Sequence, residues 1–138
     1  MLELHELSRR FGEHLAVDGV SFTVPDARMV GFVGGNGAGK TTTMRMIMGV
    51  LAPSAGEVHW DGAPVTRADR MRFGYMPEER GLYPKQPVLG QLTYLGQLHG
   101  MSQNEARERS EELLVRFGLG ERLKSKVETL SLGNQQRA

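Results

Sequence analysis

Hydrophobic and polar residues alternate in two segments of the first 24 positions of the chain. The alternation is clear at 2–4 and again at 20–24, where leucine, valine and phenylalanine occupy every second place. A period of two is typical of strands with one buried face. The run at 29–33, Met-Val-Gly-Phe-Val, is short and continuously apolar, which predicts a buried parallel strand.

The period changes after position 40. Met44, Ile47, Met48 and Leu51 stand at i, i+3, i+4 and i+7, which predicts a helix with one apolar face that ends between positions 49 and 53. We expect the methionines to fill the core.

Two β segments are expected next. Asp61-Gly62 separates 57–60 from 63–65 and predicts a tight hairpin turn. A further strand is predicted at 72–76.

The chain is predicted to be helical from Val88 onward. Ser102 and Glu105 have the spacing of a capping box, and Gly118 is a natural helix end. The predicted apolar stripe of this region consists of Ala106, Leu113, Leu114 and Phe117.

Composition narrows the class of protein. The chain has 138 residues, of which 39% are hydrophobic and 24% charged, as in ordinary globular domains. Its net charge of +1 gives no bias toward nucleic acid, so no nucleic-acid partner is expected. The absence of cysteine excludes disulfides and thiolate metal sites, and no apolar run is long enough to span a membrane. We therefore expect a cytoplasmic location.

A glycine-rich stretch lies between the predicted strand at 29–33 and the following helix. It matches the pattern G-x-x-x-x-G-K-[ST] and consists of Gly34, Gly35, Asn36, Gly37, Ala38, Gly39, Lys40, Thr41 and Thr42. Glycines let successive N–H groups converge on an anion at a helix N-terminus. The pattern places Lys40 on the β- and γ-phosphates, the Thr41 hydroxyl on Mg²⁺ and Thr42 nearer the α-phosphate. An ordinary glycine turn is the alternative, but the flanking strand and helix favour a nucleoside triphosphate site.

Two later segments, together with this loop, resemble the ATP-binding cassette (ABC) family. Positions 75–84 read Tyr-Met-Pro-Glu-Glu-Arg-Gly-Leu-Tyr-Pro, where that family has its Q-loop. Positions 130–137 read Leu-Ser-Leu-Gly-Asn-Gln-Gln-Arg, where it has its signature motif. The resemblance covers essentially the whole chain and matches the order and spacing of all three segments.

The resemblance implies an α/β fold. It is a P-loop NTPase core with an N-terminal antiparallel β subdomain and a helical subdomain, truncated before the second half of the parallel sheet. The β-rich nucleotide-binding part is expected at 1–87 and the helical subdomain at 88–138.

The resemblance also assigns roles to residues outside the loop. Phe11 stands where the family has an aromatic residue that stacks on adenine, although it could instead pack on the sheet. Val17 is expected near the base or ribose. Glu78 replaces the Q-loop glutamine and is still a competent Mg²⁺ ligand, or else belongs to an ordinary salt-bridged loop.

The signature segment is expected to act on a partner subunit. Ser131 and the backbone N–H of Gly133 would reach the γ-phosphate held by the partner's loop. Leu132 replaces a glycine of the family pattern and Asn134 a glutamine. Taken alone, Ser131 predicts only a helix cap.

The implied protein is an ATPase subunit that uses ATP and Mg²⁺. Its expected partners are a second ATP-binding subunit and a transmembrane permease, on the cytoplasmic face of the membrane, and PEERGLYP resembles the exporter branch. The family's catalytic residues lie downstream of the signature, so no residue of this chain is assigned a catalytic role. The chain is therefore expected to bind ATP but not to hydrolyse it. On its own it is also expected to be loosely packed. The alternatives are a nucleotide-gated regulatory module, or another P-loop NTPase such as a GTPase, whose Asn-Lys-x-Asp motif the sequence lacks.

Overall fold

The computed structural model describes residues 1–76 and 81–138. They belong to two compact units, residues 1–75 and 76–138. The division falls before the boundary at 87 that the sequence suggests. The reason is local, because the amides of Val127 and Glu128 donate to the carbonyls of Gln86 and Pro84 and tie this segment to the second unit.

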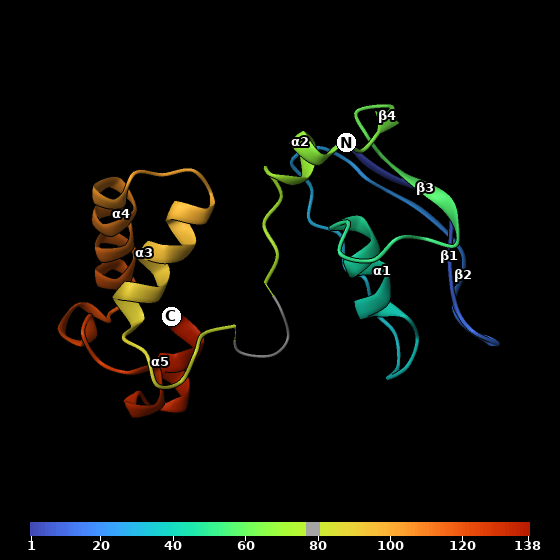
Figure 1. Ribbon diagram of the computed structural model, residues 1–138. Coiled ribbons are helices and arrows are strands. Elements are labelled where there is room, and N and C mark those ends of the chain that lie inside the picture. Colours follow the sequence, from blue (N-terminus) through green and yellow to red (C-terminus); the bar gives the residue numbers. More distant parts are fainter. Residues whose placement is uncertain (77–80) are drawn as a thin grey trace. The chain divides into compact units, whose positions relative to one another are not determined.

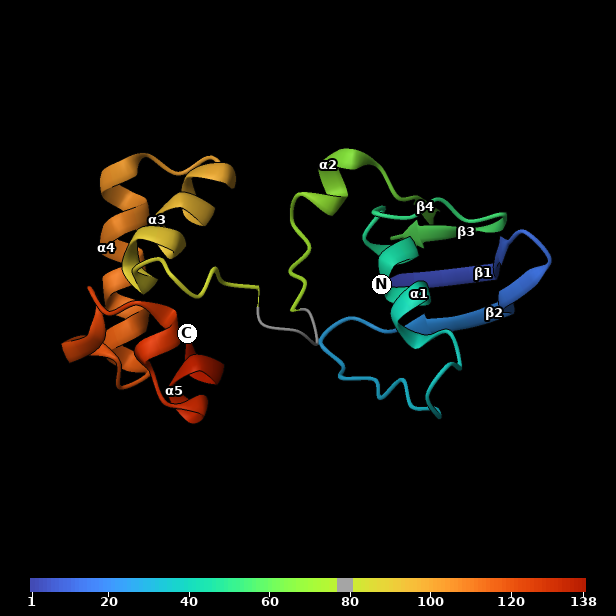
Figure 2. The same cartoon turned by 60° about the horizontal axis from the view of Figure 1, so that its bottom comes forward.

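The first unit is built on a four-stranded antiparallel sheet in the order β2-β1-β3-β4 (Figure 2). The strands are β1 (Leu2–Phe11), β2 (His14–Val24), β3 (Ala55–Trp60) and β4 (Ala63–Pro64). Leu4 of β1 is opposite Phe22 on one side and Val58 on the other. The period-two pattern therefore predicted β1 and β2 correctly.

The hairpin between β3 and β4 has the predicted turn. Asp61 and Gly62 both have positive φ, 53° and 80°, and Trp60 pairs with Ala63 across them. Two consecutive positive φ angles give the twist that a two-residue hairpin needs, which explains the Asp-Gly sequence.

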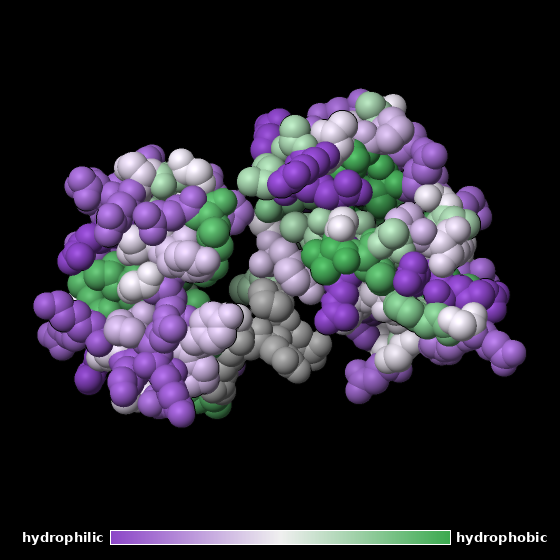
Figure 3. Space-filling view, in the orientation of Figure 1, coloured by the Kyte–Doolittle hydropathy of each residue, from purple (hydrophilic) through white to green (hydrophobic). Residues whose placement is uncertain are grey.

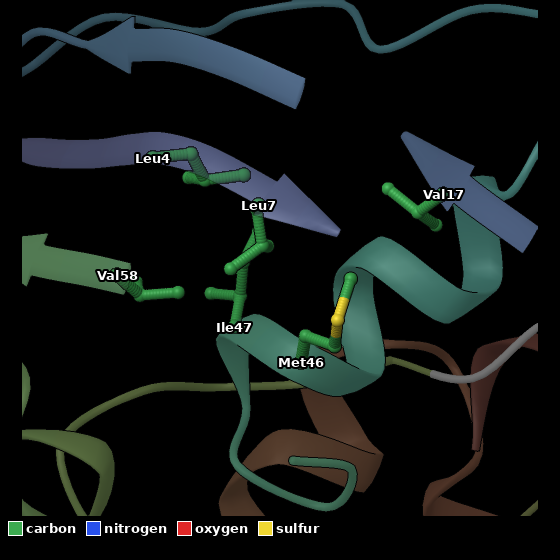
Figure 4. Close-up of a cluster of buried hydrophobic side chains, with 6 residues drawn as sticks. All are labelled: Leu4, Leu7, Val17, Met46, Ile47 and Val58. Atoms are coloured by element: carbon green, nitrogen blue, oxygen red, sulfur yellow. The ribbon is translucent and has the colours of Figure 1, made fainter. Parts of the chain in front are cut away.

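Helix α1 (Lys40–Ile47) packs on one face of this sheet, and the short helix α2 (Arg67–Arg70) follows β4. Figure 4 shows the core between α1 and the sheet, which consists of Leu4, Leu7, Val17, Met46, Ile47 and Val58. The predicted stripe of α1 is only partly correct. Thr43 and Met46 are buried instead of Met44 and Met48, which are half-buried, because the sheet contacts the face centred between Thr43 and Ile47.

The strands predicted at 29–33 and 72–76 are not formed. Among the described residues no strand pairs with either segment, and Met29 is fully exposed. A parallel strand is held by hydrogen bonds to neighbouring strands, so an apolar run without such neighbours stays irregular. Phe32 packs instead on Phe22, with ring centroids 5.2 Å apart.

These two segments leave apolar surface on the first unit. Val30 and Phe32 of one, and Phe73 and Tyr75 of the other, line an apolar hollow of about 370 Å³ beside α1. Green, hydrophobic side chains accordingly reach the surface of this unit in Figure 3.

The second unit is helical, as predicted. It contains α3 (Val88–Leu98), α4 (Gln103–Arg116), the 3₁₀ turns η1 (Gly120–Arg122) and η2 (Val127–Thr129), and α5 (Leu132–Arg137). Helices α3 and α4 pack side by side (Figure 1). The buried core consists of Val88, Leu89, Leu114, Leu119, Val127 and Leu130. Within the described ranges, no helix has the length and apolar character needed to cross a membrane.

The details of α4 differ from the prediction. The Ser102 hydroxyl accepts from the Glu105 amide at 3.3 Å, but between these two described residues the return bond from the Glu105 side chain, which would complete the capping box, is not formed. The buried face is Ala106, Ser110 and Leu114, at strict i+4 spacing, so Leu113 and Phe117 lie outside it and are exposed. The helix ends before Gly118, which has φ 78° as predicted.

Candidate functional site

The glycine-rich loop precedes α1 and is open to solvent. Residues 34–38 are exposed, and Gly39, Lys40 and Thr42 are half-buried. Gly37 and Gly39 have φ of 82° and 83°, values that favour glycine. A methyl group added at Gly35 or Gly37 would have no atom within 4 Å, so the space above these two glycines is free for a ligand. The loop is therefore accessible to a ligand.

Gly39 fixes the end of this loop against the sheet. A Cβ at this position would lie 2.5 Å from the Ala16 carbonyl oxygen and 2.9 Å from Cγ2 of Val17. Gly39 is also the N-cap of α1, and no side chain caps this helix. Among the described residues, no side-chain oxygen therefore caps the first-turn N–H groups of α1, which leaves them available to an anion.

The Lys40 side chain folds back over the loop. Its Nζ donates to the carbonyl oxygens of Gly34 and Gly35, each at 2.7 Å. The ammonium group is thus held on the loop backbone, and it forms no salt bridge with any residue that the structure describes. Its charge adds to the positive end of the α1 dipole, so the loop is electrostatically suited to phosphate.

The hydroxyl groups of three successive threonines of α1 differ in their hydrogen bonding. The Thr43 hydroxyl is buried and donates to the Gly39 carbonyl at 2.9 Å, which ties the helix to the loop. In the part of the chain that the structure describes, the hydroxyls of Thr41 and Thr42 make no hydrogen bond to protein. A free hydroxyl at Thr41 fits the predicted ligand of Mg²⁺, which prefers oxygen donors.

Phe11 and Val17 have contrasting surroundings. Phe11 ends β1 with 46% of its surface exposed, and the Arg9 guanidinium lies 4.6 Å from its ring centroid. One face of the ring is therefore covered by Arg9, and stacking on adenine would use the other. Val17 is buried in the core next to Gly39. Its position beside the loop is clear, while its contact with a base or ribose remains a prediction.

The signature segment forms the start of α5 in the second unit. Ser131 is its N-cap, and its hydroxyl accepts from the Asn134 amide at 3.4 Å. A Cβ at Gly133 would have no atom within 4 Å, and Leu132 is 60% exposed. The helix cap that Ser131 predicts on its own is confirmed. A role of Ser131 and Gly133 toward a partner's nucleotide remains a prediction, and Glu78 lies outside the described residues.

Gln91 is a positioning residue that the sequence did not reveal. It is buried in α3, where its Oε1 accepts from the Tyr83 amide at 2.6 Å and its Nε2 donates to the carbonyls of Tyr83 and Gln86 at 3.0 and 3.2 Å. These bonds hold Tyr83, near the end of the predicted Q-loop, and Gln86, just after it. A buried glutamine one turn into an apolar helix was the available signal, because a buried amide needs several partners.

Comparison with known proteins identifies the family. The family model described as ABC transporter matches residues 17–138. The ABC transporter ATP-binding protein YhaQ of Bacillus subtilis (strain 168) is 46% identical over 137 residues, which are 99% of this chain and 46% of that protein. The Nod factor export ATP-binding protein I of Paraburkholderia xenovorans (strain LB400) is 36% identical over 139 residues, 99% of this chain and 46% of that protein.

A solved structure agrees with the sequence relatives. The structure of an ATP-binding subunit of an ABC transporter superposes with a TM-score of 0.81 at 32% identity, covering 99% of this chain and 58% of that one. The chain thus spans about half the length of the curated relatives it matches. The expected fold class, a cassette with an antiparallel β subdomain and a helical subdomain, is confirmed. The chain belongs to the ABC transporter family, within which it matches the ATP-binding subunits.

Proposed function

We propose that this chain forms the nucleotide-binding part of an ABC transporter ATPase subunit, which binds Mg²⁺·ATP at residues 34–42. ATP binding would bring two such subunits together, hydrolysis would separate them, and a membrane permease would convert this cycle into transport. The family assignment supports ATP as the nucleotide.

The observation that carries this proposal is the position of Lys40 over an uncapped helix N-terminus. Its Nζ binds two loop carbonyls at 2.7 Å, and phosphate oxygens are stronger acceptors for an ammonium group than neutral carbonyls. Lys40 would therefore exchange these contacts for the β- and γ-phosphates. Thr41 would hold Mg²⁺, which neutralises charge on the phosphates during phosphoryl transfer. Glu78 would be a second Mg²⁺ ligand.

The remaining roles follow from the family pattern. Phe11 would stack on adenine with its uncovered face, and Val17 would contact the base or ribose. Ser131 and Gly133 would contact the γ-phosphate held by a second ATP-binding subunit, in a homodimer or a heterodimer. The exposure of Ser131 and the open space beside Gly133 support this assignment.

The surface formed by Tyr83, Tyr94 and Leu98 is suited to the permease. Their side chains are exposed and line one hollow with Gln91 on α3. Gln91 fixes the backbone of Tyr83 on both sides, so the exposed aromatic ring is presented by an ordered segment. Aromatic side chains with a fixed backbone are typical anchors of protein interfaces.

We further propose that the protein is peripheral on the cytoplasmic face of the membrane and serves export. A separate permease accounts for a subunit whose described helices are too short to cross a bilayer. Export is supported by the resemblance of 77–84 to the exporter branch and by the relative named for Nod factor export.

The test uses the full-length protein together with the membrane subunits that co-purify with it. The double change Tyr83→Ala and Tyr94→Ala should weaken association with these subunits by at least about tenfold, because interface aromatics contribute the most binding energy. ATP binding should stay unchanged. Phe117→Ala, which removes an exposed aromatic at the end of α4, is the matched control and should have no effect.

Two outcomes would contradict the proposal. If full-length protein hydrolyses ATP but no membrane subunit co-purifies, a nucleotide-gated regulatory module becomes the better description. If GTP binds more tightly than ATP, another P-loop NTPase, such as a GTPase, becomes the better description.

A further inference from the structure

Four polar side chains gather on the face of the sheet that points away from the core. Glu3 and His5 alternate along β1 with the buried Leu4, and Glu57 and His59 alternate in the same way along β3. Because successive side chains of a strand point to opposite faces, all four lie on the outer face. The register places Glu3 opposite His59 and His5 opposite Glu57.

The two histidines and Glu3 converge closely. The His5 and His59 rings are 4.6 Å apart and meet edge to face. His5 Nε2 lies 3.6 Å from Glu3 Oε2. One ligand atom from each of Glu3, His5 and His59 lies within 4.8 Å of the other two.

We propose that Glu3, His5 and His59 form a binding site for a divalent transition-metal ion such as Zn²⁺. Metal–ligand bonds of about 2.0–2.2 Å place neighbouring ligand atoms of a tetrahedral site roughly 3.4 Å apart. The 3.6 Å between His5 and Glu3 meets this requirement, and a spread of 4.8 Å is closed by small side-chain rotations. Three protein ligands leave a coordination position for water.

Glu57 has a separate role in this site. Its Oε2 lies 2.8 Å from His59 Nε2, so it orients the ring of one ligand. Carboxylates that hydrogen-bond a ligating histidine are common around metal ions and strengthen binding. The side chains of Glu3 and His59 are 20% and 21% exposed, so this half of the site is held on rigid strands, while His5 and Glu57 at 54% and 65% leave it open to solvent.

The ligand chemistry distinguishes this site from the nucleotide's Mg²⁺. Imidazole nitrogen is a good ligand for Zn²⁺, Cu²⁺ and Ni²⁺, whereas Mg²⁺ and Ca²⁺ take oxygen ligands. The site involves neither the glycine loop nor the signature segment. The inference is therefore independent of the proposed function, and the two can fail separately.

The test is a calorimetric titration of the purified, untagged protein with Zn²⁺ in the presence of excess Mg²⁺. One ion should bind per chain. His5→Gln and His59→Gln should each weaken Zn²⁺ binding by at least about tenfold, since each removes a ligand. His14→Gln and His99→Gln, which change the two exposed histidines outside the cluster, should leave the affinity unchanged.

A second measurement needs no variant. In the NMR spectrum of the wild-type protein, Zn²⁺ should shift the imidazole signals of His5 and His59 and leave those of His14 and His99 in place. No Zn²⁺ binding, equal affinity in His59→Gln, or shifts at all four histidines would overturn the proposal.

Discussion

The N-termini of α1 and α5 differ in whether a side chain accepts a hydrogen bond from the first-turn N–H groups. The N-cap of helix α1 is Gly39, which has no side-chain oxygen, and among the described residues no other side chain caps the helix. Helix α5 begins at Ser131, whose hydroxyl accepts from the Asn134 amide. An uncapped helix start binds an anion readily, whereas a capped one has already satisfied part of its donors. The difference fits the proposed roles, in which the glycine loop binds phosphate itself and the signature segment contacts nucleotide held by a partner subunit.

The largest expected effect is that of a methyl group at Gly39. Gly39→Ala should destabilise the first unit by about 2–4 kcal/mol, because alanine is strained at positive φ and its Cβ would overlap the Ala16 carbonyl. Urea denaturation measures this change. The matched variant Gly133→Ala at the start of α5 has open space, and helix propensity predicts stabilisation by about 0.5–1 kcal/mol. Equal losses of unfolding free energy in Gly39→Ala and Gly133→Ala would contradict the difference between the two helix starts.

Two threonines of α1 allow a structural role and a proposed ligand role to be compared within one helix. Thr43→Val removes a buried hydroxyl that donates to Gly39, so it should lower the free energy of unfolding by about 1 kcal/mol. Thr41→Val should leave stability unchanged and reduce the effect of Mg²⁺ on ATP affinity, because one of the proposed Mg²⁺ ligands is lost. Melting curves and nucleotide titrations with and without Mg²⁺ separate the two effects. A Thr41→Val protein whose response to Mg²⁺ equals that of the wild type would show that its hydroxyl is no metal ligand.

At α5 the expected effect is smaller and purely structural. Ser131→Ala removes the cap and should cost about 0.5–1 kcal/mol of stability, at the low end for N-caps because its hydrogen bond is long at 3.4 Å. ATP affinity of this chain should not change. A loss of ATP affinity in Ser131→Ala would mean that the signature contacts nucleotide without a partner.

A third helix start, that of α2, gives the smallest effect. The Thr66 hydroxyl and amide both donate to Asp69, and these bonds hold the pKa of the Asp69 carboxyl below its usual 3.8. The charged carboxylate is therefore favoured in the folded state. This contribution to stability is present above pH 3.8 and is lost as the pH falls through the lowered pKa. Asp69→Asn should make the acid unfolding curve of the first unit slightly less steep, and an identical curve would contradict this.

Local features of the fold were predictable from the sequence. The Asp61-Gly62 turn, the alternation at 2–4 and 20–24, and the glycine loop each depend on neighbouring residues, and the structure has all three. The segments at 29–33 and 72–76 have strand sequences but form no strand, since pairing depends on distant partners.

The functional residues divide in the same way. Gly39 and Lys40 could be proposed as site residues from the motif alone, and the structure places both at the start of α1, where the motif predicts them. The convergence of Glu3, His5 and His59 depends on the register between β1 and β3, and the bonds of Gln91 depend on a chain reversal. No local pattern encodes either arrangement.

The central claim is that residues 34–42 hold the phosphates of ATP through Lys40. Its most direct test is a titration of Mg²⁺·ATP into the wild-type protein and into Lys40→Ala, with Lys126→Ala in the second unit as the matched control. Loss of a charge-assisted contact of about 1.5–3 kcal/mol predicts ATP affinity roughly ten- to a hundredfold weaker in Lys40→Ala and unchanged in Lys126→Ala. Equal ATP affinity in a folded Lys40→Ala protein would contradict the assignment of this loop as the nucleotide site.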